Sequence, residues 1–183
     1  MTNPLLAFFG GIPLFSKLNG EELGEIIRAI QPVTLTEGDF LFKETEPADA
    51  AFVVQTGSLS VYLDRRHGRI DLATLEAGSM IGEITLIDGG LRTATVRAIS
   101  DCTLFRLDKS EFDFLRRNLR PAAYKLIREI SITVCSRLRD TNQLIQEQWG
   151  TEPSTVDNTQ TSEPDALASK PSLLKRLQFW KES

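Results

Sequence analysis

The stretch GSMIGEITLIDGGLRTATVRA, residues 78–98, carries the most distinctive pattern of the chain. Gly82 and Glu83 follow a short apolar run, and the turn DGG separates them from Arg92, which precedes the run TATV. The pattern predicts a strand, one turn of helix, a second turn and another strand. It brings one carboxylate and one guanidinium into a region that is otherwise apolar, which calls for a chemical reason.

The residue types of this stretch suit a phosphorylated sugar. Gly82 lets the backbone approach a ligand closely, and free amides at the start of a helical turn attract anions. The Arg92 guanidinium is a planar donor for a phosphate, whereas the Glu83 carboxylate can accept a hydrogen bond from a sugar hydroxyl. These features predict a nucleotide monophosphate pocket, and the alternative is a plain structural ion pair between Glu83 and Arg92. Its apolar walls are expected from Ile81, Ile84 and Leu86.

The residues around this stretch alternate short β-prone runs with turn residues. Between residues 32 and 107 the runs are VTLT, FLFKE, AFVVQ, SLSVYLD, IDLATL, TATVRAI and CTLFRL. Many short strands at near-regular spacing indicate an antiparallel sandwich or barrel. The predicted fold class is α+β, mainly β, with an eight-stranded antiparallel jelly-roll barrel flanked by N-terminal helices and a long C-terminal helix.

Helical patterns flank the strands on both sides. Residues 1–31 are expected to be helical, with Asn19 as the N-cap of GEELGEIIRAI. Residues 108–149 predict two helices, because the first must end before Pro121 and the second can begin there. The second helix is nearly thirty residues long and needs a partner surface, and it is expected to cover the barrel mouth and also to pair with a second copy of the chain. Its apolar stripe is formed by Ile127, Ile130, Val134, Leu138, Thr141 and Ile145.

The last 34 residues have a different character. Residues 150–171 lack periodicity and are rich in Thr, Ser, Pro and acidic residues, which predicts a disordered linker. Residues 172–183 form a short amphipathic tail, with Leu173, Leu177 and Trp180 on one face. This tail is interpreted either as a loosely docked terminus or as a motif for a partner groove or an anionic surface.

The composition excludes several functional classes. The net charge is −4 and the pI is near 5.2, which does not favour a large nucleic-acid interface. Cys102 and Cys135 form no CxxC or Cys/His cluster, and the single histidine, His67, lies in a basic turn, so neither structural zinc nor catalysis by an enzyme is expected. The run LLAFFGGIPLF is too short to span a bilayer and is preceded by no basic residue, so the expected location is cytoplasmic.

The run IGEITLIDGGLRTATVRA resembles the phosphate-binding cassette of cyclic nucleotide-binding domains. This family is shared by catabolite activator proteins, the regulatory regions of cAMP- and cGMP-dependent kinases and some ion channels. Its pattern is F-G-E-[LIM]-A-L followed by P-R-[AST]-A-[TS]-V, from which Ile81, Thr85 and Leu91 depart without removing a charge. The resemblance extends over residues 12–145, through IPLFSKLNGEELGEI, EGDFLFKETEPADAAFVVQTGSLSVY and RLRDTNQL. The resemblance implies that residues 1–149 form a cyclic nucleotide-binding domain.

The resemblance implies roles for particular residues. Gly82 and Glu83 would hold the ribose 2′-hydroxyl, and Arg92 would pair with the cyclic phosphate. Thr93 and Ala94 would offer backbone amides to the same phosphate, with Ile81 and Ile84 beside the ligand. A threonine after the arginine resembles cGMP-selective sites, but bacterial cAMP receptors often carry serine there, so the base stays open with cAMP slightly favoured. On the long helix, Thr141 and Asn142 would reach the base, unless they are only solvated helix positions.

Two functional hypotheses follow. The first is a cytoplasmic, non-enzymatic receptor for cAMP or cGMP, without a cofactor, that changes conformation and signals through a protein partner that contacts the C-terminal helix or the tail. Direct DNA binding is not expected, because the residues after Trp149 are too few for a helix-turn-helix module. The second hypothesis is a ligand-independent adaptor in which the long helix serves dimerisation.

Overall fold

The computed structural model describes residues 3–149, with side chains as far as residue 143. The predicted linker 150–171 and tail 172–183 lie outside these residues, as does the side chain of Ile145. The elements are, in order, α1 (Pro4–Gly10), the 3-10 turn η1 (Pro13–Phe15), α2 (Gly20–Ala29), β1 (Ile30–Leu35), β2 (Phe40–Phe42), β3 (Ala50–Thr56), β4 (Leu59–Arg65), β5 (Gly68–Leu75), β6 (Met80–Ile81), α3 (Thr85–Asp88), β7 (Thr95–Ala98), β8 (Cys102–Asp108), α4 (Lys109–Arg117) and α5 (Pro121–Trp149).

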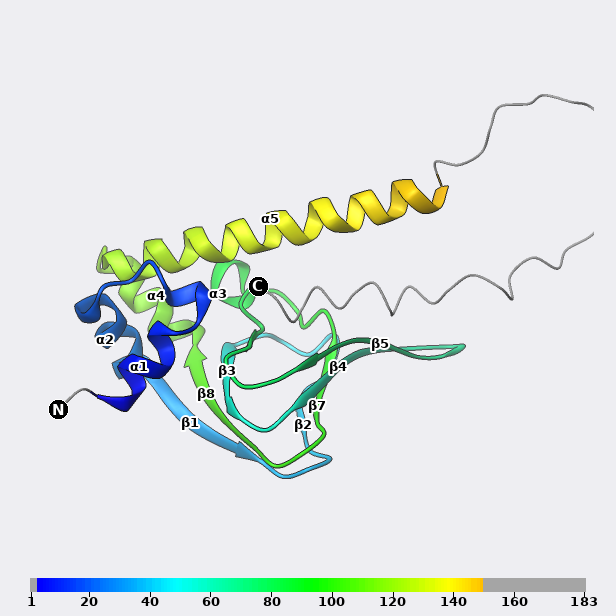
Figure 1. Cartoon of the computed structure of the whole chain (residues 1–183), viewed down its shortest axis with the longest axis horizontal. Helices are drawn as coiled ribbons and strands as arrows, with labels where there is room; N and C mark the ends of the chain where they lie inside the picture. Colours follow the sequence, from blue (N-terminus) through cyan, green and yellow to red (C-terminus); the bar gives the residue numbers. More distant parts are fainter. Residues whose placement is uncertain (1–2, 150–183) are drawn as a thin grey trace, which may run out of the picture.

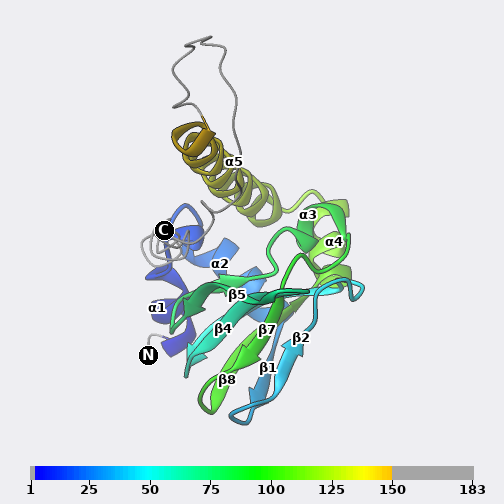
Figure 2. The same ribbon diagram turned by 90° about the vertical axis from the view of Figure 1, so that its right-hand side faces the viewer.

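The strands form two antiparallel sheets of four, with the orders β1-β8-β3-β6 and β2-β7-β4-β5. Figure 2 shows β5, β4, β7 and β2 side by side in the second of these sheets. The predicted mixed fold with mainly antiparallel strands is therefore confirmed, but the predicted closed eight-stranded barrel is not formed. Within residues 3–149, no strand of one sheet pairs along its length with a strand of the other. The reason is local: β6 pairs only with Phe52 and Val53, because the chain turns out of the sheet at Gly82.

One apolar core fills the space between the two sheets. It contains Phe42, Phe52, Val54, Leu59, Val61, Val96 and Leu104. In β3 and β8 the side chains alternate between this core and a second one on the outer face of the same sheet. Both strands are consequently buried on both faces, which explains why the run AAFVV is apolar without interruption.

The second core packs the helices against the sheet of β1, β8 and β3. Its members include Phe9, Phe15, Ile26, Phe105, Phe112, Leu126 and Ile130. The ring of Phe9 lies 5.2 Å from that of Phe15 and 5.4 Å from that of Phe105, centroid to centroid, and so joins the N-terminal helices to β8. Figure 1 shows α1, α2 and α4 gathered at one end of the molecule, beside β1 and β8.

The predicted helix boundaries at Asn19 and Pro121 are confirmed. The Asn19 side chain accepts a hydrogen bond from the Glu22 amide, and the Glu22 side chain accepts one from the Asn19 amide, which is a complete capping box. Helix α5 begins at Pro121 and spans 29 residues. Its predicted apolar stripe holds only as far as Val134: Ile130 is buried, whereas Leu138 is 59% exposed. The cause is visible in Figure 1, where the second half of α5 projects away from the helical cluster.

Candidate functional site

The cassette predicted from residues 78–98 has the expected local structure. Strand β6 ends at Ile81, α3 makes one turn from Thr85 to Asp88, and β7 begins at Thr95. Gly82 has a φ of +74°, a conformation that residues with a Cβ rarely adopt. A Cβ at this position would also lie 2.5 Å from the Arg92 Nη1 atom. The two ends of the cassette therefore meet, with the Gly82 backbone directly against the Arg92 guanidinium.

The backbone of Arg92 is fixed by the loop that precedes β3. The Thr45 amide donates to the Arg92 carbonyl at 2.8 Å, and the Arg92 amide donates to the Glu46 carbonyl at 2.9 Å. A β-bridge between Pro47 and Leu91 adjoins these bonds. The position from which the Arg92 side chain enters the interior is consequently set by main-chain contacts and not by the side chain itself.

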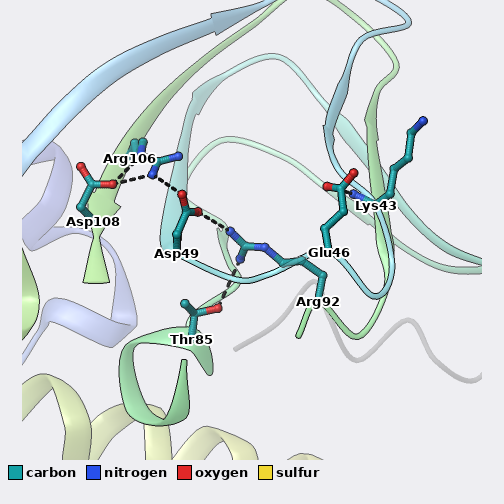
Figure 3. Close-up of polar contacts among 7 residues, drawn as sticks. All are labelled: Lys43, Glu46, Asp49, Thr85, Arg92, Arg106 and Asp108. Carbon is teal, nitrogen blue, oxygen red and sulfur yellow. Dashed lines mark hydrogen bonds and ion pairs between the residues drawn. The ribbon is translucent and has the colours of Figure 1, made fainter. Parts of the chain in front are cut away.

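The Arg92 guanidinium is buried but incompletely hydrogen-bonded (Figure 3). The residue is 5% exposed, and its guanidinium carbon lies 4.0 Å from the centroid of the Phe42 ring. Its Nη1 donates to Thr85 Oγ1 at 3.3 Å and its Nη2 to Asp49 Oδ1 at 3.4 Å, both long for charge-assisted bonds. Its Nε has no hydrogen-bond partner among the described residues. Burial lowers the pKa of Arg92, and the neighbouring Asp49 charge acts in the opposite direction.

The Glu83 carboxylate does not pair with Arg92. It is also buried, at 5% exposure, and accepts a hydrogen bond at 2.5 Å from Nη1 of Arg137 on α5. The sequence alternative of a structural Glu83–Arg92 ion pair is therefore wrong. Arg137 was missed by sequence reasoning; the signal that could have found it is its place one helical turn before Thr141.

A hollow of about 480 Å³ lies beside the Glu83–Arg137 pair. Its walls come from the η1 region, the turn between β5 and β6, and α5; they are Gly11, Ile12, Pro13, Leu14, Leu75, Ala77, Gly78, Ser79, Met80, Glu83, Glu129, Thr133 and Arg137. The expected acceptor for a sugar hydroxyl, Glu83, thus faces this space. Arg92 does not line it; it lies in the cassette behind Gly82.

The other predicted site residues are distributed as follows. Ile81 and Ala94 are buried in the core between the sheets, whereas Ile84 and Thr93 are exposed at the cassette surface. Thr141 and Asn142 are exposed on α5, and the Thr141 hydroxyl donates to the Arg137 carbonyl at 2.8 Å. The structure therefore brings Gly82 and Arg92 together and leaves Thr141 and Asn142 outside the hollow.

Three findings on the described residues bear on other classes of function. Among residues 3–149, no group of three or more His, Cys, Asp or Glu side chains is arranged to hold a metal ion. A search of the same part of the chain for a helix of the length and apolarity that a bilayer requires found none. The two cysteines are free thiols, Cys102 buried and Cys135 exposed.

Comparison with known proteins identified a matching family. A family model described as the cyclic nucleotide-binding domain matches residues 32–118. A crystal structure of the N-terminal domain of a transcriptional regulator from Streptomyces coelicolor A3(2) is 34% identical in sequence, with a TM-score of 0.63. The match covers 75% of this chain and 94% of that one.

Two curated proteins are similar over a shorter region. A cyclic nucleotide-gated potassium channel of Mesorhizobium japonicum is 36% identical over 104 residues, which is 57% of this chain and 28% of the channel. A cGMP-dependent protein kinase of Caenorhabditis elegans is 32% identical over 103 residues, which is 56% of this chain and 13% of the kinase. The similarity is thus to one part of each of these proteins.

Proposed function

Because the chain belongs to the cyclic nucleotide-binding domain family, we propose that it is a receptor for cAMP or cGMP that changes conformation on binding and signals through a protein partner. The observation that carries this proposal is the buried Arg92 guanidinium with an unpartnered Nε. A buried cation with an unused donor is unfavourable for folding alone. It is suited to an anion that arrives later and supplies the missing acceptor.

The cassette offers groups for each part of a cyclic nucleotide. The cyclic phosphate would be held by Arg92, with backbone amides from Thr93 and Ala94. The ribose 2′-hydroxyl would donate to the Glu83 carboxylate, beside the Gly82 backbone. This division of roles places the charged half of the ligand at the guanidinium and the neutral half at the carboxylate, which avoids repulsion between Glu83 and the phosphate.

The Glu83–Arg137 ion pair is the proposed route from the ligand to α5. The carboxylate would have to share its oxygens between a ribose hydroxyl and the Arg137 guanidinium, so ligand binding changes the strength with which α5 is held. A ligand can shift the position of α5 only by its differential affinity for the two positions. Thr141 and Asn142 lie one turn further along α5, and they contact the base in this proposal only when the helix moves toward the cassette.

The exposed surface of α5 supports a signalling role through protein contacts. Ile132 is 48% exposed and Leu138 is 59% exposed, so both are available to a partner protein or to a second copy of the chain. The proposal includes no catalytic step and no direct DNA contact, and it places the protein in the cytoplasm. The base preference is left between adenine and guanine.

A thermal-shift series with the full chain tests this function. The melting temperature is measured with cAMP, cGMP, AMP and GMP at equal concentrations. A rise with one cyclic nucleotide and none with the acyclic monophosphate of the same base supports the receptor, because a ligand that binds the folded protein raises the melting temperature and the proposed site is one for a cyclic phosphate. The absence of a rise with either cyclic nucleotide would favour the adaptor hypothesis instead.

A further inference from the structure

The carboxylate of Asp49 is shared between two arginines (Figure 3). Its Oδ2 accepts a hydrogen bond from Nη2 of Arg106 at 2.8 Å, and its Oδ1 accepts the longer bond from Nη2 of Arg92 at 3.4 Å. Arg106 lies on β8, outside the cassette. Both arginines lie near the Phe52 ring: the guanidinium carbon of Arg106 is 5.6 Å from the ring centroid, and that of Arg92 is 5.7 Å from it.

The position of Arg106 is fixed from two directions. The strands β3 and β8 pair with Phe52 opposite Arg106, and Ala50 opposite Asp108, so Asp49 lies at the end of this ladder. On its other side, the Arg106 Nε donates to Asp108 Oδ1 at 2.7 Å. Arg106 is therefore held between two carboxylates and keeps its orientation whether or not Arg92 moves.

The pKa values agree with this order of strength. A hydrogen bond from Arg106 is the main cause that lowers the pKa of Asp49, and the charge of Arg92 contributes less. Burial acts to lower the pKa of Arg106, but the hydrogen bonds to Asp49 and Asp108 outweigh it and raise this pKa. Asp49 thus interacts more strongly with Arg106 than with Arg92.

Without Arg106, the contacts that lower the pKa of Asp49 would be reduced to a hydrogen bond from its own backbone and the charge of Arg92. The Asp49 side chain is 66% exposed and has room to turn, and an unneutralised carboxylate beside a guanidinium closes to a charge-assisted bond of about 2.8 Å. A carboxylate in that position would occupy a donor of Arg92 and would repel an incoming phosphate.

We propose that Arg106 is a positioning residue of the anion site, which holds the Asp49 carboxylate and so leaves the Arg92 guanidinium free for the phosphate. This inference rests on the proposed function, since it assumes that the phosphate of a cyclic nucleotide binds at Arg92. It adds a residue from β8 to a site that the sequence placed in the cassette alone.

Titration calorimetry with cAMP and cGMP on four variants of the full chain tests the inference. Arg106→Met is expected to weaken binding about tenfold, because the phosphate must first break the Asp49–Arg92 bond. A tenfold change corresponds to the lower end of the energies of charge-assisted hydrogen bonds. Asp49→Asn should bind within about threefold of the wild type, and so should the double variant, because the competing carboxylate is gone. The matched control is Arg69→Met on β5, outside the cassette, which removes the same charge, a ring contact with Tyr62 and a bond to the Asp71 carboxylate; it should change the affinity less than about twofold.

The outcomes are distinguishable. If Arg106→Met binds like the wild type, or if the double variant is as weak as Arg106→Met, the positioning role is overturned while the receptor function stands. If the wild type binds neither nucleotide, the proposed function itself fails and the inference falls with it. Should Arg106→Met fail to fold, Arg106→Lys replaces it, with an expected loss of about threefold because an ammonium cannot match the fork geometry toward both carboxylates; an unchanged affinity there also overturns the role.

A spectroscopic readout separates positioning from a merely structural effect. The ¹⁵N resonance of Arg92 Nε in the ligand-free protein should shift in Arg106→Met, as Asp49 closes on this guanidinium, and should return in the double variant. A resonance that stays at the wild-type position in Arg106→Met would show that Asp49 does not move, and would contradict the inference.

Discussion

Replacing Arg92 with methionine separates the two roles that a buried guanidinium can have. Methionine has a similar length and no charge, so it can occupy the space over Phe42 without leaving a large cavity. If Arg92 is present for a ligand, the variant should lose binding and keep its stability. If Arg92 is a structural residue, the variant should instead lose stability and keep its binding.

The contacts of Arg92 set the expected magnitudes. The ring contact with Phe42, at 4.0 Å, is worth about 1 kcal/mol. The bonds to Thr85 and Asp49, at 3.3 and 3.4 Å, each add less than about 1 kcal/mol. Against them stands a buried, unpartnered Nε, which costs about 1–3 kcal/mol. The opposing contributions nearly cancel, so the free energy of unfolding of Arg92→Met should lie within about 1 kcal/mol of the wild type.

Binding should respond much more strongly than stability. Loss of a charge-assisted contact of about 2–3 kcal/mol lowers the affinity for a cyclic nucleotide roughly 30- to 150-fold. Urea denaturation gives the free energy of unfolding, and titration calorimetry gives the affinity. Arg69→Met is the control, because it removes an arginine on β5, outside the cassette, that also pairs with a carboxylate, that of Asp71, and lies over an aromatic ring, that of Tyr62. The reasoning is refuted if Arg92→Met binds as tightly as the wild type, or if it unfolds more easily by over about 2 kcal/mol.

Three further changes test other parts of the molecule. Glu83→Gln removes the ion pair with Arg137, so amide hydrogen exchange in α5 should become faster while nucleotide affinity falls about tenfold; unchanged exchange would mean that the pair does not hold the helix. Gly82→Ala places a residue with a Cβ at a backbone φ of +74°. It should lower the free energy of unfolding, measured by urea denaturation, by about 1–3 kcal/mol. A hydrogen bond from Lys109 lowers the pKa of Asp113, so its stabilising contribution is present above the unfolded-state pKa and is lost as the pH falls through the folded-state value. Urea midpoints of the wild type and Asp113→Asn should therefore differ at about pH 6 and converge toward about pH 2; parallel curves would contradict this.

Local patterns in the sequence predicted local structure well. The N-cap at Asn19, the start of α5 at Pro121 and the strand–helix–strand course of the cassette are each decided by a few neighbouring residues. Turn residues and caps act through contacts only three or four residues apart, which is the range that a pattern can reveal. The sequence therefore predicted where the chain turns and which groups stand at the cassette.

The partners of those groups could not be predicted in the same way. Glu83 pairs with Arg137, 54 positions away, and Arg106 pairs with Asp49, 57 positions away. Such contacts depend on how helices and sheets are placed in space, and charged residues on a helix or strand leave several geometries open until the fold is known. The same limit explains why the predicted closed barrel was wrong. Alternation of apolar and polar residues indicates strands with one packed face. Closure depends on the pairing of edge strands, which this periodicity does not specify.

The distribution of these pairs suggests why the carboxylate and the guanidinium of the cassette remain apart. Each has a partner from outside the cassette: Glu83 is held by α5, and Arg92 is weakly held by Asp49, the residue directly before β3. If Glu83 and Arg92 were paired with each other, a ligand would have to break a buried ion pair, and the cost of two desolvated charges would fall on binding. With separate partners, as in the proposed function, a phosphate would complete the bonds of Arg92 while a ribose hydroxyl would share Glu83 with the helix. Binding would then change the contacts of two distant elements at once, which is what coupling between a ligand and a helix surface requires.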